Sequence, residues 1–131
     1  GIVGQEVECA VLGNEEPIAS LVGEIESCND FYDYDAKYIN EASKLYIPAR
    51  IEQKISDEIR ETAVRAYKAL GCRGLARVDF FVREGDNKVL LNEPNTIPGF
   101  TSISMYPKMF QKSGVEYPEL IDRLFTLACE R

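Results

Sequence analysis

The stretch LARVDFFVREGDNKVLLNEPN, residues 75–95, decides the fold and carries the most informative side chains. Its first nine residues alternate as a β-strand does, with a continuous apolar face formed by every second residue. The polar residues 84–87 predict a turn, and residues 88–95 predict the returning strand. The stretch therefore predicts a β-hairpin. The face of its first strand opposite the apolar one carries Arg77, Asp79 and Phe81.

The pairing of this hairpin predicts an unusual set of neighbours. If the turn centres on Asp86, Asp79 lies opposite Glu93 and Arg77 lies opposite Asn95. Opposed Cβ atoms lie roughly 5 Å apart, and at an effective dielectric of about 20 two carboxylates at that separation repel by roughly 3 kcal/mol. A bound divalent cation would relieve the repulsion, because Mg²⁺ prefers oxygen ligands. Two solvated acids on a wet sheet face are the alternative, and the hairpin alone does not separate the two.

The segment after the hairpin favours the metal site. Pro94 and Pro98 are not expected in a central strand, so the acidic strand should end in a rigid loop that contains Gly99. Such a loop can direct backbone N–H groups at an anion or a developing oxyanion. A metal-binding strand end followed by an anion-binding loop indicates phosphate chemistry. The hydroxyl residues of this loop are Thr96, Thr101 and Ser102.

Three segments, in order along the chain, resemble one known family. They are GQEVECAVLG (residues 4–13), FYDYDAKY (31–38), and GLARVDFF with LLNEPNTIPGFTSISMYP (74–81 and 90–107). Together they resemble the C-terminal region of D-alanine–D-alanine ligases, which belong to the ATP-grasp superfamily. The resemblance runs from about residue 2 to the C-terminus. It implies the C-terminal ATP-grasp subdomain over residues 1–131, with the N-terminal and central domains of the enzyme absent from this chain.

The resemblance assigns roles at the hairpin and its loop. It implies two Mg²⁺ ions, replaceable by Mn²⁺, held by Asp79, Glu93 and Asn95. It implies that Arg77 binds the acyl phosphate and the tetrahedral intermediate, and that the Gly99 N–H faces the oxyanion. Both residues are therefore expected to be catalytic and substrate-binding.

Further roles fall on other segments. The resemblance implies that Lys37 neutralises the γ-phosphate of ATP and that Tyr38 closes a mobile loop over the first D-alanine, so both are catalytic candidates and Lys37 also binds the nucleotide. Without the resemblance, this segment would indicate a tyrosine-rich surface loop. The remaining candidates are Ile2 beside adenine and Glu6 at the ribose for ATP, and Ser104 with the Met105 backbone for the carboxylate of the second D-alanine.

The implied reaction forms D-alanyl-D-alanine for peptidoglycan synthesis through a D-alanyl phosphate. A bacterial, cytoplasmic enzyme that is a homodimer at full length is expected. A resistance ligase that uses D-serine is the nearest rival. D-Lactate is disfavoured because those ligases replace the Asp-Ala-Lys-Tyr part of the loop and often use histidine there, and this chain has no histidine. A different ATP-grasp carboxylate–amine ligase and a noncatalytic regulatory domain with a decayed site are two further rivals.

Composition limits the function classes. The 131 residues are 45% hydrophobic and 28% charged, as in one globular domain. The net charge of −7 and the lack of a basic run argue against nucleic acid or an anionic membrane as partner. Four cysteines without a C-x-x-C pair predict a reduced protein without a thiolate zinc site, and Cys9 and Cys72 are expected to be small apolar residues of the interior.

The pattern of the whole chain predicts an α+β class with a mainly antiparallel sheet and helices packed on one side. Strands are expected at 7–12 and 17–25, and a long functional loop at 30–47. A helix should run from Ser56, as its N-cap, to Leu70, with Gly71 ending it. Residues 96–107 should form a loop. The residues expected to face inward on a last helix that begins at Pro118 are Leu120, Ile121, Leu124, Leu127 and Ala128.

Overall fold

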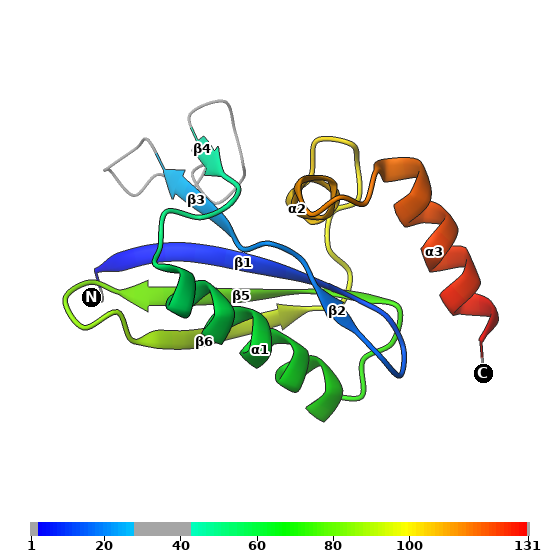
Figure 1. Cartoon of the computed structure of the whole chain (residues 1–131), viewed down its shortest axis with the longest axis horizontal. Coiled ribbons are helices and arrows are strands. Elements are labelled where there is room, and N and C mark those ends of the chain that lie inside the picture. The colour runs from blue at the N-terminus through cyan, green and yellow to red at the C-terminus, as the bar shows by residue number, and fades with distance from the viewer. Residues whose placement is uncertain (1–2, 28–42, 131) are drawn as a thin grey trace.

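A computed structural model describes residues 3–27 and 43–130 of the chain. Within these ranges four strands are followed by one helix, then by two strands and two helices, and the three helices pack around one sheet (Figure 1). The elements are β1 (Gly4–Leu12), β2 (Ile18–Ala19), β3 (Gly23–Ser27), β4 (Ser43–Tyr46), α1 (Gln53–Ala69), β5 (Leu75–Arg83), β6 (Val89–Asn95), α2 (Met105–Lys112) and α3 (Tyr117–Cys129).

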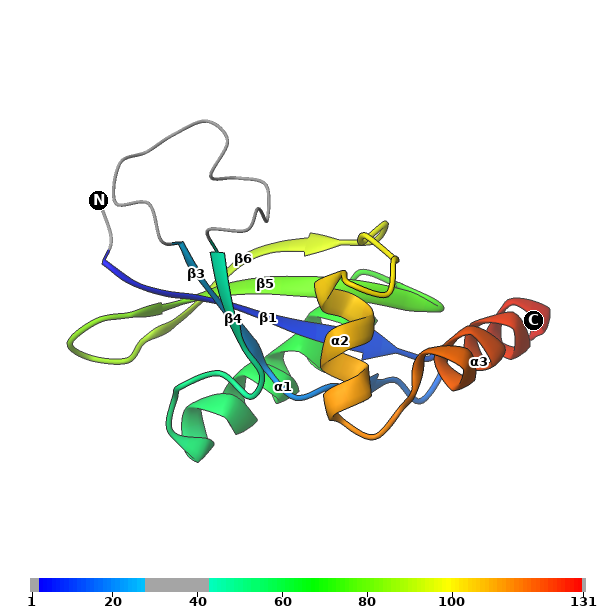
Figure 2. The same cartoon turned by 90° about the horizontal axis from the view of Figure 1, so that it is seen from above.

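The sheet is antiparallel at every pairing recorded, in the order β4-β3-β1-β5-β6, with β2 paired to β1 away from this path. The long strand β1 pairs with β5 along its whole length, from Gly4 opposite Arg83 to Leu12 opposite Leu75. The predicted hairpin is confirmed as β5 and β6, which lie side by side in both views (Figures 1 and 2). β1 and β5 therefore form the centre of the sheet, and β6 is an edge strand.

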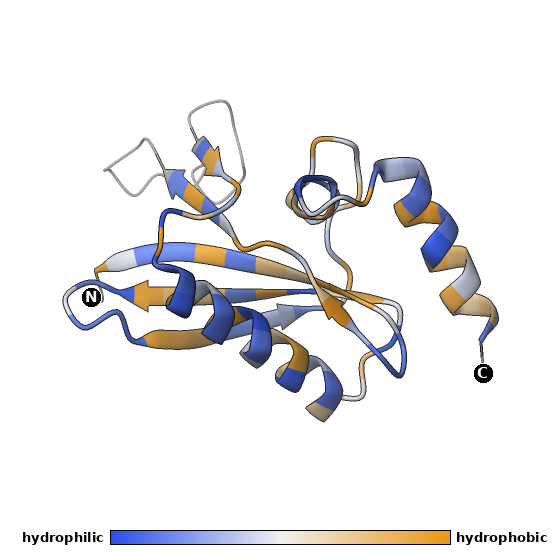
Figure 3. Cartoon of the chain, in the orientation of Figure 1, coloured by the Kyte–Doolittle hydropathy of each residue, from blue (hydrophilic) through white to orange (hydrophobic). Residues whose placement is uncertain are grey.

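Helices cover both faces of the sheet. On one face, α1 packs its buried residues Ile55, Ile59, Ala63 and Tyr67 against alternate residues of β1 and β5. On the other face, α2 and α3 pack over Ala10 and Leu12. The predicted α+β class with a mainly antiparallel sheet is confirmed, but the expectation that the helices lie on one side is wrong. Along α3, hydrophobic and hydrophilic bands alternate (Figure 3), as expected for a helix with one packed face.

The helix α1 begins earlier than the sequence predicted. It starts at Gln53 after Glu52, so Ser56 lies inside the helix and is not its N-cap. No side chain caps this helix, and Glu52 occupies the extended position before it. The predicted end is confirmed, because Gly71 has φ +68 and follows the C-cap Leu70. Leu70, the last residue of the predicted helix, is 60% exposed.

Four other expectations need correction. The strand expected at 17–25 is broken, because Ser20 bonds back to Ala10 through both its N–H and its hydroxyl. The loop expected at 30–47 includes β4, and the loop expected at 96–107 ends where α2 begins. Ala128 is exposed on α3.

Cys9 is fully buried as expected, and burial raises the pKa of its thiol to about 12. Within the described residues, no helix has the length and apolarity needed to cross a membrane.

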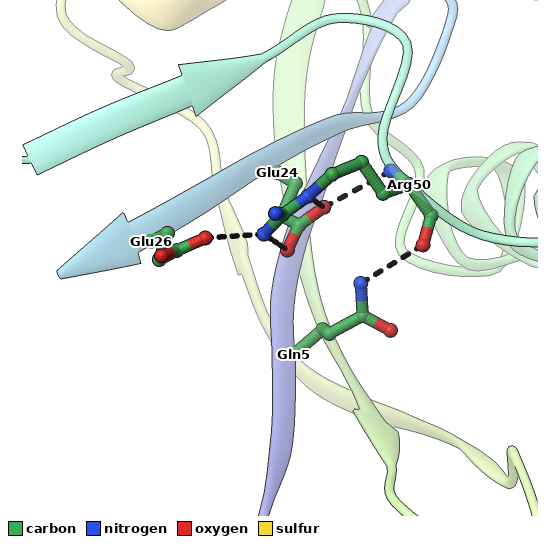
Figure 4. Close-up of polar contacts among 4 residues, drawn as sticks. All are labelled: Gln5, Glu24, Glu26 and Arg50. Carbon is green, nitrogen blue, oxygen red and sulfur yellow. Dashed lines mark hydrogen bonds and ion pairs between the residues drawn. The ribbon is translucent and has the colours of Figure 1, made fainter.

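A cluster of polar side chains ties β3 to β1 and to the segment before α1 (Figure 4). Glu24 is 2% exposed, and its carboxylate accepts hydrogen bonds from Arg50 Nε at 3.2 Å, Arg50 Nη2 at 2.8 Å and the Arg50 backbone N–H at 3.0 Å. Glu26 also pairs with Arg50, and the Gln5 amide donates to the Arg50 carbonyl at 3.1 Å. The guanidinium lies 3.7 Å from the centre of the Tyr46 ring. This cluster fixes the β3–β4 pair against the central strand.

The pKa of Glu24 predicts how this anchor depends on pH. Burial opposes ionisation, but the hydrogen bonds from Arg50 outweigh it and hold the pKa below its ordinary value of 4.5. A lowered pKa means that the carboxylate stabilises the folded state above pH 4.5 and that this contribution is lost as the pH falls through the lowered pKa. At pH 7, Glu24→Gln should lower the hydrogen-exchange protection of the β3 and β4 amides about tenfold, or about 1.4 kcal/mol.

The difference in hydrogen-exchange protection between the wild type and Glu24→Gln should become smaller as the pH falls below 4.5. Glu26→Gln is the matched control, because Glu26 pairs with the same arginine but its side chain is 42% exposed, so it should change protection by less than about 1 kcal/mol. Equal effects of the two substitutions at pH 7 would contradict the anchoring role of Glu24.

Candidate active site

Three acids form a row across adjacent strands on the sheet face that α2 and α3 cover only at one end. Glu8 in β1 pairs with Asp79 in β5, and Asp79 pairs with Glu93 in β6. Two pairs further along, and on the same face, Arg77 lies opposite Asn95. The predicted neighbours are therefore confirmed as backbone partners, and the predicted alternation of β5 is confirmed by buried residues at every second position.

The register reaches these partners through a β-bulge. Near the turn, Phe80 pairs with Leu91 and Phe81 pairs with Leu90. Asp79 then pairs with Glu93, so Asn92 is one extra residue in β6. Pro94 lies within β6, not in the loop after it, and the edge position explains why a proline is tolerated there.

Arg77 is the cation of the site. Its Nε donates to Asp79 Oδ1 at 2.8 Å and its Nη2 donates to Asp79 Oδ2 at 3.0 Å, so the guanidinium grips both carboxylate oxygens. The same Nε lies 3.4 Å from Glu8 Oε1. The hydrogen bonds to Asp79 raise the pKa of Arg77, burial opposes them, and the charges of Glu8 and Glu93 add to the rise. One fixed positive charge thus stands among three acids.

Glu8 is a member of the site that the sequence did not predict. It is 8% exposed, and its Oε1 is a buried atom without a hydrogen-bond partner among the described residues. Burial raises the pKa of Glu8 to about 7, while the Arg77 charge opposes the rise and the Asp79 and Glu6 charges add to it. The signal that would have found it is the pairing of β1 with β5, which joins segments some 70 residues apart.

The donor chemistry of this face suits a hard divalent cation. Asp79 and Glu93 offer carboxylate oxygens, and Asn95 offers an amide oxygen, which are ligands that Mg²⁺ accepts. In the described part of the chain, no group of three His, Cys, Asp or Glu residues is arranged to hold a metal. The set therefore depends on the Asn95 amide, whose Oδ1 also accepts the Ile97 N–H at 3.0 Å, and on ligands such as phosphate from a substrate.

A cavity of about 490 Å³ opens beside the row of acids. Glu6 and Glu8 of β1 and Asp79 of β5 line it. Phe81 and Leu90, which pair across β5 and β6, add apolar surface. A cavity with apolar walls, beside an exposed carboxylate and a row of acids that could take up a cation, has the chemistry to hold a nucleotide base, its ribose and its phosphates. Glu6, the predicted ribose ligand, is exposed there.

The loop after β6 places Gly99 against Ser104. A Cβ at Gly99 would lie 3.2 Å from Ser104 Oγ, so only glycine fits without displacing that side chain. Ser104 is the N-cap residue of α2, but its hydroxyl accepts the Thr101 N–H at 3.1 Å and bonds the Thr101 hydroxyl at 2.9 Å. The Ser104 side chain makes no capping hydrogen bond, so it does not occupy the first backbone N–H groups of α2.

The side chain of Met105 is only 2% exposed and lies in the core, so the predicted role of this residue can fall only to its backbone. Its terminal methyl lies 2.6 Å from where a Cβ of Gly23 would stand, so Gly23 makes room for α2 on this face. Three predicted site residues, Ile2, Lys37 and Tyr38, lie outside the described residues.

The chain matches the family described as "D-ala D-ala ligase C-terminus" over residues 1–126. The antiparallel sheet with its three helices matches the C-terminal ATP-grasp domain of D-alanine–D-alanine ligases. The chain belongs to this family.

Individual relatives agree with this assignment. The chain is 59% identical to a D-alanine–D-alanine ligase of Acetivibrio thermocellus over 99% of its length, which is 35% of that protein. Among solved structures, it resembles the D-alanine–D-alanine ligase of Coxiella burnetii at 46% identity and a TM-score of 0.81, covering 98% of this chain and 32% of that one. It resembles the VanG D-Ala:D-Ser ligase of Enterococcus faecalis at 47% identity and a TM-score of 0.84, covering 97% and 37%. The chain thus spans about a third of the relatives that it matches.

Proposed function

We propose that this chain is the C-terminal ATP-grasp subdomain of an ATP-dependent D-alanine–D-alanine ligase. The observation that carries the proposal is the row Glu8, Asp79 and Glu93 with Arg77 among them, on the open part of the sheet face beside a cavity of about 490 Å³. Family membership and relatives named as this ligase support the reaction. The proposed enzyme phosphorylates the carboxylate of one D-alanine with ATP, and the amine of a second D-alanine then displaces phosphate.

The residues of this chain take distinct parts in that reaction. Asp79, Glu93 and Asn95 would hold two Mg²⁺ ions, or Mn²⁺ in their place, which supply charge neutralisation at the phosphates when bound. Glu6 accepts hydrogen bonds from the ribose hydroxyls, and Phe81 packs against the base. Arg77 offers its terminal N–H groups to the acyl phosphate and to the tetrahedral oxyanion, where charge develops.

The second amino acid would lie at the start of α2. The first N–H groups of that helix carry the positive end of its dipole, which favours a carboxylate. Ser104 and the Met105 N–H are the donors at this position, and the Gly99 N–H faces the oxyanion. We assign Lys37 to the γ-phosphate and Tyr38 to the first D-alanine on the resemblance alone, since both lie outside the described residues.

One observation favours a second candidate. The VanG D-Ala:D-Ser ligase resembles this chain as strongly as the Coxiella burnetii enzyme does, at 47% against 46% identity. D-Serine as second substrate is therefore the alternative. For the whole protein we propose a cytoplasmic homodimer that supplies peptidoglycan synthesis.

Phosphate release by the full-length protein tests the function. With ATP, Mg²⁺ and D-alanine as the first substrate, D-alanine as the second substrate should give faster release than D-serine, and D-lactate should give none above background. Identification of D-alanyl-D-alanine by mass spectrometry should accompany the release. Faster release with D-serine would establish the second candidate, and no D-amino-acid-dependent release with either would contradict both.

A further inference from the structure

The buried carboxyl of Glu8 has no part in the mechanism proposed above. It lies directly opposite Asp79 and 3.4 Å from Arg77 Nε, yet its Oε1 has no hydrogen-bond partner among the described residues. A buried acceptor left without a partner is destabilising and calls for an explanation. Packing alone does not supply one, because an apolar residue would fill the same space without that cost.

Asp79 cannot serve Arg77 and a cation in the same way. Both of its oxygens accept hydrogen bonds from the guanidinium, at 2.8 and 3.0 Å. A divalent ion must take at least one of these oxygens at about 2.0–2.1 Å, the distance typical of Mg²⁺. The charge of the ion at that oxygen repels the guanidinium, so cation binding weakens at least one hydrogen bond between Arg77 and Asp79. The guanidinium is largely buried, with a side-chain exposure of 20%, and a second acceptor would offset this loss.

The Glu8 carboxylate is close enough to become that acceptor for the Arg77 Nε–H. The distance of 3.4 Å between Glu8 Oε1 and Arg77 Nε is a few tenths of an ångström longer than an ordinary N–H···O hydrogen bond. We propose that Glu8 is a positioning residue that takes the Nε–H of Arg77 from Asp79 when a divalent cation binds. The inference rests on the proposed function, since it assumes a cation at Asp79.

The exchange has a consequence for the arginine. Held by Glu8 through Nε, Arg77 depends less on Asp79 for its position, so Nη2, which donates to Asp79 Oδ2 in this structure, can turn toward a phosphate or an oxyanion. Cation binding would then both occupy Asp79 and present Arg77 to the substrate. The two events are coupled through one shared guanidinium.

The test measures cation binding and not only activity. Titration of the full-length protein with Mn²⁺, followed by electron paramagnetic resonance, should give a dissociation constant that Glu8→Gln raises about 10- to 100-fold, the usual effect of losing a group that orients a metal ligand. Glu8→Asp, which keeps the charge, should restore part of the affinity and provides a second variant if the glutamine protein does not fold. In proteins with ¹⁵N-labelled arginine and saturating Mg²⁺, the Arg77 Nε–H resonance should shift further in the wild type than in Glu8→Gln.

Glu6→Gln controls for the loss of one negative charge. Glu6 lies on the same strand and face but is exposed, so its effect on Mn²⁺ binding should stay below about threefold. A dissociation constant for Glu8→Gln within twofold of wild type would overturn the inference. So would a loss as large as that of Asp79→Asn, because Glu8 would then be a ligand itself. If the wild-type protein bound no Mn²⁺, or if Asp79→Asn and Glu93→Gln bound it normally, the proposed metal site would fail as well.

Discussion

Glu93→Gln should reduce ligation by the full-length enzyme by more than about 100-fold and leave its stability nearly unchanged. Glu93 lies opposite Asp79, so the substitution removes a cation ligand and also removes a repulsion between two carboxylates. Losing a residue that merely orients a metal ligand costs about 10- to 100-fold, and losing the ligand should cost more. The measurements are the rate of D-alanine-dependent phosphate release and the thermal unfolding midpoint.

Glu84→Gln is the matched control for this prediction. It makes the same change of charge in an exposed residue at the tip of the same hairpin, away from the row of acids. Activity should remain at the wild-type level. If Glu93→Gln also retained near wild-type activity, or bound Mn²⁺ as tightly as wild type, Glu93 would not be a metal ligand.

Arg77→Lys should lower the turnover number by about 100- to 1,000-fold while the protein still folds. Lysine keeps a positive charge between Glu8 and Asp79, so the buried acids stay compensated. It has no planar fork, so it cannot hold one anion by two parallel hydrogen bonds. Removing one donor to a developing oxyanion typically costs about 10²–10³ in turnover. Steady-state kinetics with D-alanine varied should show the loss in turnover number more than in KM.

The same strand provides the control. Arg83 in β5 forms the same kind of two-pronged pair, with Asp86 at the exposed turn. Arg83→Lys should leave turnover unchanged, because its pair lies at the solvated tip of the hairpin. Equal turnover in Arg77→Lys and wild type would show that Arg77 contributes charge alone.

The local pattern predicted the hairpin and its polar face because both depend on residues close in sequence. Alternation in β5 is a property of nine consecutive residues, and the turn follows from polar residues and Gly85. The same reasoning failed for Glu8, whose neighbourhood depends on the pairing of β1 with β5. It also missed α2, an eight-residue helix with a buried face that includes Met105, Tyr106 and Met109. This helix follows a loop that contains Pro98 and Gly99.

The prediction that Asp79 opposes Glu93 was right, but its premise was not. A turn centred on Asp86 would pair Arg83 with Val89. In the structure Arg83 donates its N–H to the Lys88 carbonyl, and Val89 pairs with Val82. Continued without interruption, that register would place Asn92 opposite Asp79 and send Glu93 to the core face. The bulge at Asn92 returns Glu93 to the face of Asp79, and no pattern in the strand sequence predicted this bulge.

This bulge bears on how the hairpin can change in length during evolution. Because Asn92 is the extra residue, a β6 one residue shorter could drop it, continue as a regular ladder from Leu91 to Glu93, and keep the same acid opposite Asp79. A single-residue deletion inside a strand ordinarily turns every following side chain to the wrong face. Here β6 contains one extra residue, Asn92, that the pairing does not need, so relatives with hairpins of different lengths can present the same pair of acids.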